Sequence, residues 1–195
     1  MNTYSSVVFL HVIAAIGLFA ALVIEWMSLR LLQRSASYEQ GRESMAVWGL
    51  VAKVGGPATL VALASGIYLA RTIGAWNLSW VAVAIPTMIV IAIAGVPSAR
   101  IRKRLANLIA ENAGRLPDEL RTQLTPRTWT ASLRVRTALL LGLVYEMTAK
   151  PTEGVVAIVA FAVLGLAWGA MPLRNAASAS VTGSAASRSA EATRH

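Results

Sequence analysis

The chain has 195 residues, of which 56% are hydrophobic, and its mean hydropathy is +0.59, a composition typical of membrane proteins. It contains no cysteine, which excludes disulfides, thiolate metal sites, iron–sulfur clusters and covalently attached c-type haem. The net charge of +9 is carried by residues between apolar stretches, where positive charge sets membrane topology. No nucleic-acid-binding pattern accompanies these charges, so we expect no nucleic-acid partner.

Four apolar stretches are long enough, or nearly long enough, to cross a membrane as helices. About 20 apolar residues span ~30 Å of hydrocarbon. In chain order the four stretches are Ser5 to Leu29, Val47 to Ala70, Leu78 to Val96 and Gly154 to Leu173. Blocks of Val, Ile, Leu and Ala of this length predict an all-α fold, namely a polytopic bundle of transmembrane helices.

An amphipathic helix is predicted after the third stretch, from Ser98 to Ala113, because its apolar residues recur at helical spacing. Four cations lie on it: Arg100, Arg102, Lys103 and Arg104. We expect this helix to lie in the cytoplasmic headgroup layer and to attract anionic lipid headgroups through these cations. A docking surface for a partner subunit is the alternative.

The segment from about Thr130 to Ala149 is the weakest predicted span. Arg134, Arg136 and Glu146 leave it an uncharged core of nine residues, roughly 13 Å of helix. It crosses only if both arginines reach the inner interface and Glu146 lies near the outer interface or faces protein. Trp129, just before it, is a suitable interfacial anchor. We therefore predict five spans, with four spans as the alternative.

Positive charge is distributed unevenly along the chain. Fifteen of the 18 Lys and Arg residues lie in residues 30–45, 98–136 and 174–195, and two lie in the other connections between spans. The positive-inside rule then places the N-terminus outside and the C-terminus in the cytoplasm. The transmembrane domain covers residues 1–174, and the Ala/Ser-rich residues 175–195 are predicted to be a disordered tail.

Three ionisable residues lie inside the first two predicted spans. Glu25 follows His11 by fourteen residues, which places the two only ~40° apart around a helix, so both face the bundle. Lys53 lies near the inner end of the second span, at the depth of Glu25. We predict an intramembrane ion pair between Glu25 and Lys53. It either fixes the register of the two helices, which we favour, or relays protons or ions.

His11 is the second candidate site. Tyr68 and Glu146 are expected at its depth, and an imidazole near a phenol and a carboxylate binds a metal or haem, or shuttles protons to a quinone. Haem b would need Met88 or Met147 as a second ligand, an open axial position or a second chain, because the other histidine lies in the tail. Copper lacks further ligands within one chain. The alternative is a histidine that is hydrogen-bonded to a tyrosine or a backbone carbonyl across a helix interface.

Two short motifs resemble those of known membrane proteins. They are Phe9-Leu10-His11-Val12-Ile13-Ala14-Ala15-Ile16-Gly17 and Leu63-Ala64-Ser65-Gly66-Ile67-Tyr68-Leu69-Ala70. The pair resembles small bacterial multi-pass membrane proteins with a Leu-His-x-x-x-Ala first helix, and distantly resembles the membrane domain of copper-resistance D-type proteins. The resemblance implies the bacterial inner membrane and copper handling, with His11 as the ligand that carries over.

Three classes of function follow from these features. We rank first an accessory or scaffold subunit of a membrane complex. A haem-, metal- or quinone-binding protein centred on His11 is second, and a small transporter is third. The sequence contains no nucleophile–base set and no HExxH motif, so we do not expect an enzyme. The pattern Gly165-Leu166-Ala167-Trp168-Gly169 permits close helix contact, which is compatible with a homo-oligomer.

Overall fold

The computed structural model of the protein describes residues 2–117 and 127–171. Within these residues the chain forms five α-helices, one short 3-10 helix and no β-strand. The elements are α1 (Thr3–Arg34), α2 (Tyr38–Thr72), η1 (Ala75–Asn77), α3 (Ser79–Ala110), α5 (Arg127–Ala149) and α6 (Gly154–Ala170). The predicted all-α fold class is therefore confirmed. The predicted disordered tail, residues 175–195, lies outside the described residues.

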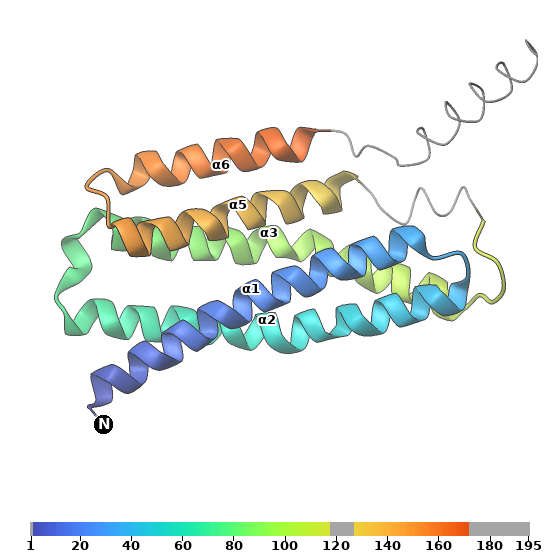
Figure 1. Ribbon diagram of the computed structural model, residues 1–195, viewed down its shortest axis with the longest axis horizontal. Coiled ribbons are helices and arrows are strands. Elements are labelled where there is room, and N and C mark those ends of the chain that lie inside the picture. The colour runs from blue at the N-terminus through green and yellow to red at the C-terminus, as the bar shows by residue number, and fades with distance from the viewer. Residues whose placement is uncertain (1, 118–126, 172–195) are drawn as a thin grey trace, which may run out of the picture.

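The helices lie side by side with their long axes roughly aligned (Figure 1). α1 packs along α2, and α5 packs along both α6 and α3. The α2–α3 and α5–α6 connections lie at the same end of the bundle as the N-terminus. The α1–α2 connection and the C-terminal ends of α3 and α6 lie at the opposite end. Successive helices therefore run in alternating directions, as a multi-pass membrane protein requires.

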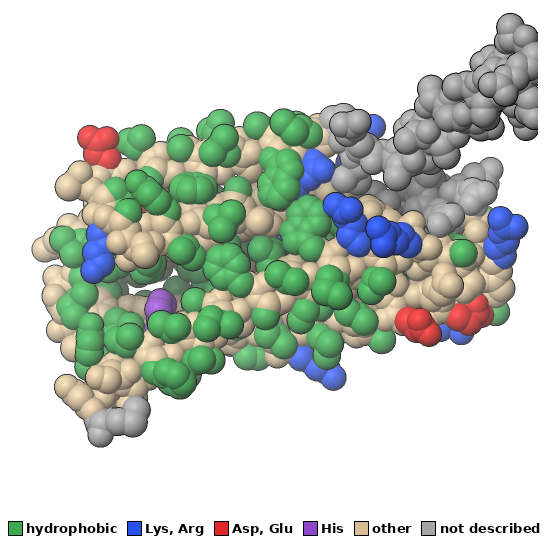
Figure 2. Space-filling view, in the orientation of Figure 1, with side chains coloured by type: hydrophobic (Ala, Val, Ile, Leu, Met, Phe, Trp, Pro, Cys, Tyr) green, Lys and Arg blue, Asp and Glu red, His purple; other side chains and the backbone are tan. Residues whose placement is uncertain are grey.

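Three of the helices, α1, α2 and α3, are long and apolar enough to cross a membrane, and α6 is a shorter apolar helix. Large apolar side chains also face outward, for example Phe9, Leu60 and Val163, which are 64%, 70% and 57% exposed. Hydrophobic side chains cover much of the visible face in Figure 2. A soluble monomer rarely exposes so much apolar surface, whereas lipid is a suitable neighbour for it. Helix length and surface chemistry together support a membrane protein.

The helix boundaries follow local chemistry. Asn2 caps α1 by accepting a hydrogen bond from the Tyr4 backbone N–H at 3.4 Å, and Ser37 caps α2 by accepting one from the Gln40 backbone N–H at 3.3 Å. Such side-chain oxygens satisfy N–H groups that have no partner inside the helix. After α2 the chain turns at Gly74, whose φ of +65° is a backbone conformation that glycine adopts without strain.

α3 continues through Pro97 to Ala110 as one helix, so the structure does not contain a separate amphipathic helix from Ser98 to Ala113. The apolar face of this segment explains the difference, because Leu105 and Ile109 are buried in the protein core. Arg42 of α2 also donates hydrogen bonds to the backbone oxygens of Ile109 and Asn112, at 3.3 and 2.7 Å. Side-chain donors of this kind satisfy the carbonyls at a helix end.

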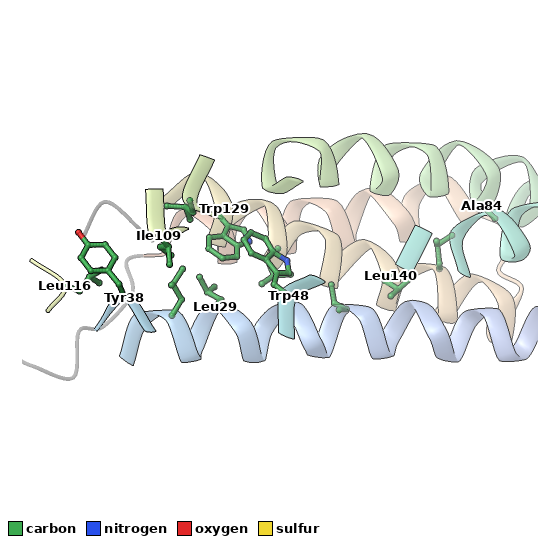
Figure 3. Close-up of a cluster of buried hydrophobic side chains, with 13 residues drawn as sticks. Leu29, Tyr38, Trp48, Ala84, Ile109, Leu116, Trp129 and Leu140 are labelled. Carbon is green, nitrogen blue, oxygen red and sulfur yellow. The ribbon is translucent and has the colours of Figure 1, made fainter. Parts of the chain in front are cut away.

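The largest apolar cluster follows the bundle axis toward the end opposite the N-terminus (Figure 3). Trp48 and Trp129 stack face to face at its centre, with ring centroids 4.2 Å apart. Beyond them, Tyr38, Ile109 and Leu116 close the end of the bundle. Trp129 is fully buried, so its prediction as an interfacial anchor was wrong.

Candidate functional site

His11 on α1 is bound to α2 rather than to a cluster of ligands. Its Nδ1 lies 2.9 Å from the Ser65 hydroxyl, and that hydroxyl donates its hydrogen bond to the Val61 carbonyl at 2.5 Å. A hydroxyl carries only one proton, so when Ser65 donates to this carbonyl, Nδ1 of His11 donates to Ser65. In that tautomer Nε2 carries no proton and can accept a hydrogen bond, and it forms none with the described residues. His11 is therefore hydrogen-bonded across a helix interface, as the alternative prediction had it, but its partner is a serine hydroxyl and not a tyrosine or a backbone carbonyl.

Gly66 makes this close approach of α1 and α2 feasible. A Cβ atom at Gly66 would lie 3.2 Å from Cε1 of His11, which is tighter than ordinary van der Waals contact. The Ser65-Gly66 dipeptide therefore provides both the hydrogen-bond acceptor and the space for the imidazole ring. These two residues are part of the second sequence motif, so the motif has an explanation in helix packing.

The other residues predicted at the His11 site do not gather around it. Tyr68 is 42% exposed, and Met88 packs against the main apolar cluster. Glu146 is fully buried on α5. Within residues 2–117 and 127–171, none of these three side chains forms a hydrogen bond with His11, and no three His, Cys, Asp or Glu residues form a metal-binding group. The residues present therefore do not fit the copper site that the resemblance implies.

Glu146 occupies a closed space of its own. Neither of its carboxylate oxygens has a hydrogen-bond partner among the described residues. A Cβ atom at Gly154 would lie 2.8 Å from Oε2 of Glu146 and 3.3 Å from the Trp80 backbone. The carboxyl group is thus enclosed between α5, the first residue of α6 and the start of α3. Burying an ionised carboxylate without a hydrogen-bond partner costs folding free energy, because the charge loses its hydration.

Glu25 lies at the centre of a polar cluster on the other half of the bundle. It is only 2% exposed. One of its carboxylate oxygens accepts a hydrogen bond from Arg136 at 2.5 Å and another from the Trp129 indole N–H at 3.3 Å. Both donors come from α5. Glu25 therefore connects α1 to α5.

The predicted Glu25–Lys53 ion pair was wrong. Glu25 forms its salt bridge with Arg136, and Lys53 is exposed on α2. The prediction compared only the depth of the residues along their helices. The helix face matters equally, because Glu25 points toward α5 and the Lys53 side chain points outward. An Arg guanidinium also binds a carboxylate in a fixed planar geometry that Lys does not offer.

Further side chains extend this polar group across four helices. Arg136 also donates to the Ser98 hydroxyl of α3 at 3.4 Å. Trp129 stacks on Trp48 of α2, and the Arg102 guanidinium of α3 lies 5.5 Å from the centre of the Trp48 ring. We call these six residues the Glu25 cluster: Glu25, Trp48, Ser98, Arg102, Trp129 and Arg136.

The second arginine of α5 is bound at the end of α6. Arg134 is 7% exposed and donates hydrogen bonds to the backbone oxygens of Trp168 and Met171 at 2.6 and 2.7 Å. Its guanidinium also lies 5.6 Å from the centre of the Trp168 ring. A cation at a helix C-terminus interacts favourably with the helix dipole. Arg134 and Arg136, which made this span doubtful in the sequence, thus both have partners within the protein.

Two cavities border the Glu25 cluster. The first, of about 550 Å³, lies between α1, α2, α3 and α5 and is lined mainly by apolar residues together with polar members of the cluster. The second, of about 530 Å³, is lined by Met45, Val96, Ala99, Arg100, Arg102, Lys103 and Ala106. Val96, Ala99 and Arg102 line both cavities, so the two spaces are neighbours along one face of α3.

No protein-family model matches this sequence, and no similar protein was found among curated proteins or solved structures. The class of protein therefore follows from the fold and its surface: a helical bundle with three helices that can cross a membrane. The resemblance to copper-resistance D-type domains depends on the two short motifs alone.

Proposed function

We propose that this chain is a five-span protein of the bacterial inner membrane and serves as an accessory or scaffold subunit of a larger membrane complex. In this proposal the N-terminus lies outside and the C-terminus lies in the cytoplasm. The alternating helix directions and the positive residues at one end of the bundle support this orientation.

The environment of α5 supports its role as a span. α5 has 23 residues, or about 34 Å of helix, enough for ~30 Å of hydrocarbon. Arg136 is neutralised by Glu25, and Arg134 is bound to the end of α6. An ionisable residue inside a membrane is tolerated when it faces the bundle and has such partners.

The observation that carries the scaffold role is a folded extension beyond the Glu25 cluster, which we call the charged head. It consists of residues 26–47 and 99–117, and it borders the cluster at Arg102. Its own core contains Leu29, Leu32 and Ile109, all at most 1% exposed. Backbone hydrogen bonds of 3.0 Å, from Tyr38 to Gly114 and from Leu116 to Ala36, connect its loops.

The surface of the charged head is suited to binding a soluble domain or subunit. Arginine and glutamate side chains are exposed on it, including Arg34 and Glu43, and charged groups gather at this end of the molecule in Figure 2. A rigid charged surface that is continuous with membrane helices can hold a partner at the membrane. Complementary charges on such surfaces determine which partner binds and how fast.

Blue-native electrophoresis of membranes from the source cell tests this role. We expect the chain to migrate in an assembly larger than the chain expressed alone in another host. The charge exchange Arg34→Glu with Glu43→Arg should abolish the large assembly. The matched exchange Arg71→Glu with Glu153→Arg, at exposed residues of the opposite end, should preserve it. Migration as a single small species from the native membrane would contradict the proposal.

The second candidate is a ligand site at His11, and the observation that favours it is that Ser65 binds Nδ1 and leaves Nε2 without a hydrogen bond to a described residue. The imidazole is only partly buried, and its orientation is fixed by Ser65. An unprotonated Nε2 can accept a hydrogen bond from a quinol or bind haem iron. We expect a visible absorption band, or a quinone in the organic extract, that is lost in His11→Gln. Retention of the bound molecule in a folded His11→Gln variant excludes this candidate.

A further inference from the structure

The two cavities beside the Glu25 cluster differ in chemistry. The smaller one is lined by three cations, Arg100, Arg102 and Lys103, and by no acidic residue. The larger one is mainly apolar, and its one acid, Glu25, is bound to Arg136. Because Val96, Ala99 and Arg102 line both, a cationic space and an apolar space meet along one face of α3.

We propose that these joined cavities form a binding site for one anionic phospholipid of the cytoplasmic leaflet. The phosphate group binds in the smaller cavity, and an acyl chain enters the larger one. The inference goes beyond the scaffold role, which needs no ligand. It also replaces the general headgroup attraction expected from the sequence with a defined site, in which Arg104 has no part because it lines neither cavity.

Arg102 is the residue on which recognition of the phosphate depends. Its guanidinium lies against the Trp48 ring, which fixes the side chain without using its N–H groups. No described residue accepts a hydrogen bond from it. Arginine binds phosphate oxygens through two parallel hydrogen bonds, and such charge-assisted bonds are among the strongest in proteins. The buried Nε of Arg136 also lacks a described partner.

The walls of the larger cavity suit an alkyl chain. Leu18, Leu22 and Ile91 contribute apolar surface, and Gly56 of α2 leaves space beside them. At Gly56 an added Cβ atom would meet no atom within 4 Å. The volume of about 550 Å³ lies within the range of ~300–1,000 Å³ that is usual for ligand cavities.

The position of the site favours a membrane lipid over a soluble anion. Leu60 and Val96, which line the larger cavity, are 70% and 43% exposed, so the cavity opens at the outer surface of the bundle. On that surface the neighbour is the bilayer. The cations lie toward the end of α3 that we place in the cytoplasm, where the leaflet is rich in anionic lipid.

Native mass spectrometry of the purified full-length chain tests the proposal. The probes are dioleoyl phosphatidylglycerol and, as the zwitterionic counterpart, dioleoyl phosphatidylcholine. We expect one phosphatidylglycerol to be retained, with an affinity at least about tenfold above that for phosphatidylcholine. Arg102→Gln should reduce this preference about tenfold, whereas Arg104→Gln, an exposed residue of the same helix, should preserve it.

A second pair of variants tests the apolar space without removing a charge. Gly56→Leu should fill the larger cavity and displace the lipid. Gly49→Leu is the control, because Gly49 lies on the same helix, also has no neighbour within 4 Å of an added Cβ atom, and lines neither cavity. This pair remains informative if Arg102→Gln fails to fold.

Three results would overturn the proposal. The first is equal retention of phosphatidylglycerol and phosphatidylcholine, which means a nonspecific lipid shell. The second is equal loss of lipid in Arg102→Gln and Arg104→Gln. The third is displacement of the phospholipid by millimolar inorganic phosphate, which means a soluble-anion site. Loss of the large assembly on electrophoresis bears only on the scaffold role, so the two proposals fail separately.

Discussion

At the scale of single residues, Glu25 shows how a charge is accommodated inside this bundle. Its carboxylate is buried, but it accepts hydrogen bonds from both Arg136 and Trp129. A buried ion pair contributes little net stability compared with an apolar pair, because both groups lose their hydration. Removing one partner is much more costly, since the remaining charge is buried without compensation. This asymmetry makes the pair testable.

We predict that Glu25→Gln and Arg136→Gln each lower the free energy of unfolding by on the order of 3–5 kcal/mol. The double variant should recover a large part of that loss. Lys53→Met is the control and should have little effect, because Lys53 is exposed. Unfolding in detergent, followed by circular dichroism, measures all four. Strictly additive losses from the two single substitutions would show that Glu25 and Arg136 do not interact.

Glu146 presents the opposite case, a buried carboxyl group without a described partner. Replacing a buried polar group that has no hydrogen bond by an apolar one removes its desolvation cost, about 1–3 kcal/mol. We therefore predict that Glu146→Met raises the midpoint of thermal unfolding. Gly154→Ala should lower it, because the added Cβ atom would lie 2.8 Å from Glu146 Oε2. A lower midpoint for Glu146→Met would indicate that a lipid, ligand or partner chain hydrogen-bonds this carboxyl group.

At the scale of elements, α6 depends on α5 through its glycines. Cβ atoms at Gly165 and Gly169 would lie 2.8 and 3.5 Å from the Cβ atoms of Ala138 and Ala131. The small-residue pattern that suggested contact between two copies of the chain is therefore used inside one chain. Small residues allow the backbones of membrane helices to approach closely, which strengthens van der Waals packing.

We predict that Gly165→Ala separates α6 from α5 and lowers the free energy of unfolding by about 1–3 kcal/mol, the usual cost of overpacking. Gly49→Ala is the matched control in another helix. It has no neighbour within 4 Å of an added Cβ atom, so it should be neutral or stabilise by about 0.5–1 kcal/mol through backbone entropy. Thermal unfolding of both variants in the same detergent measures the difference. Equal effects at the two positions would show that α6 does not pack closely on α5.

The sequence predicted the helices well because length and hydropathy are local properties. Each predicted span falls largely within one helix, such as Ser5 to Leu29 in α1, but α2 begins well before Val47 and α3 continues well beyond Val96. The weak segment from Thr130 to Ala149 lies within α5. The exact end of α3 was not predicted. The span was predicted to end at Val96, with a separate helix from Ser98, but packing of Leu105 and Ile109 in the core continues α3.

The polar contacts were much harder to predict, because they depend on which helix faces meet. Glu25 and Arg136 were both visible as charges within spans, yet they lie 111 residues apart in the chain. The depth of each residue along its helix could not identify its partner. No feature of the sequence predicted the stacking of Trp48 on Trp129. An interfacial tryptophan and a buried one cannot be distinguished from the sequence.

At the scale of the whole molecule, the bundle has two parts with a cavity between them. α1 and α2 form one closely packed pair, and α3, α5 and α6 form the other group. The Glu25 cluster joins the two parts near the charged head, while His11 and Glu146 lie toward the opposite end in separate environments. The half of the bundle that carries most of the cationic residues is thus also the half where the Glu25 cluster connects four helices.

The topology of the whole bundle gives the last prediction. The chain contains no cysteine, so single cysteines can be placed at Asn77, Ala113 and Thr152, all of which are exposed. If the N-terminus is outside and all five helices cross, an impermeant thiol reagent added to intact cells labels positions 77 and 152 but not 113. If α5 does not cross, position 152 lies inside and stays unlabelled. Labelling of position 113 from outside would contradict the orientation, because residues 98–136 would then place their positive charge on the wrong side.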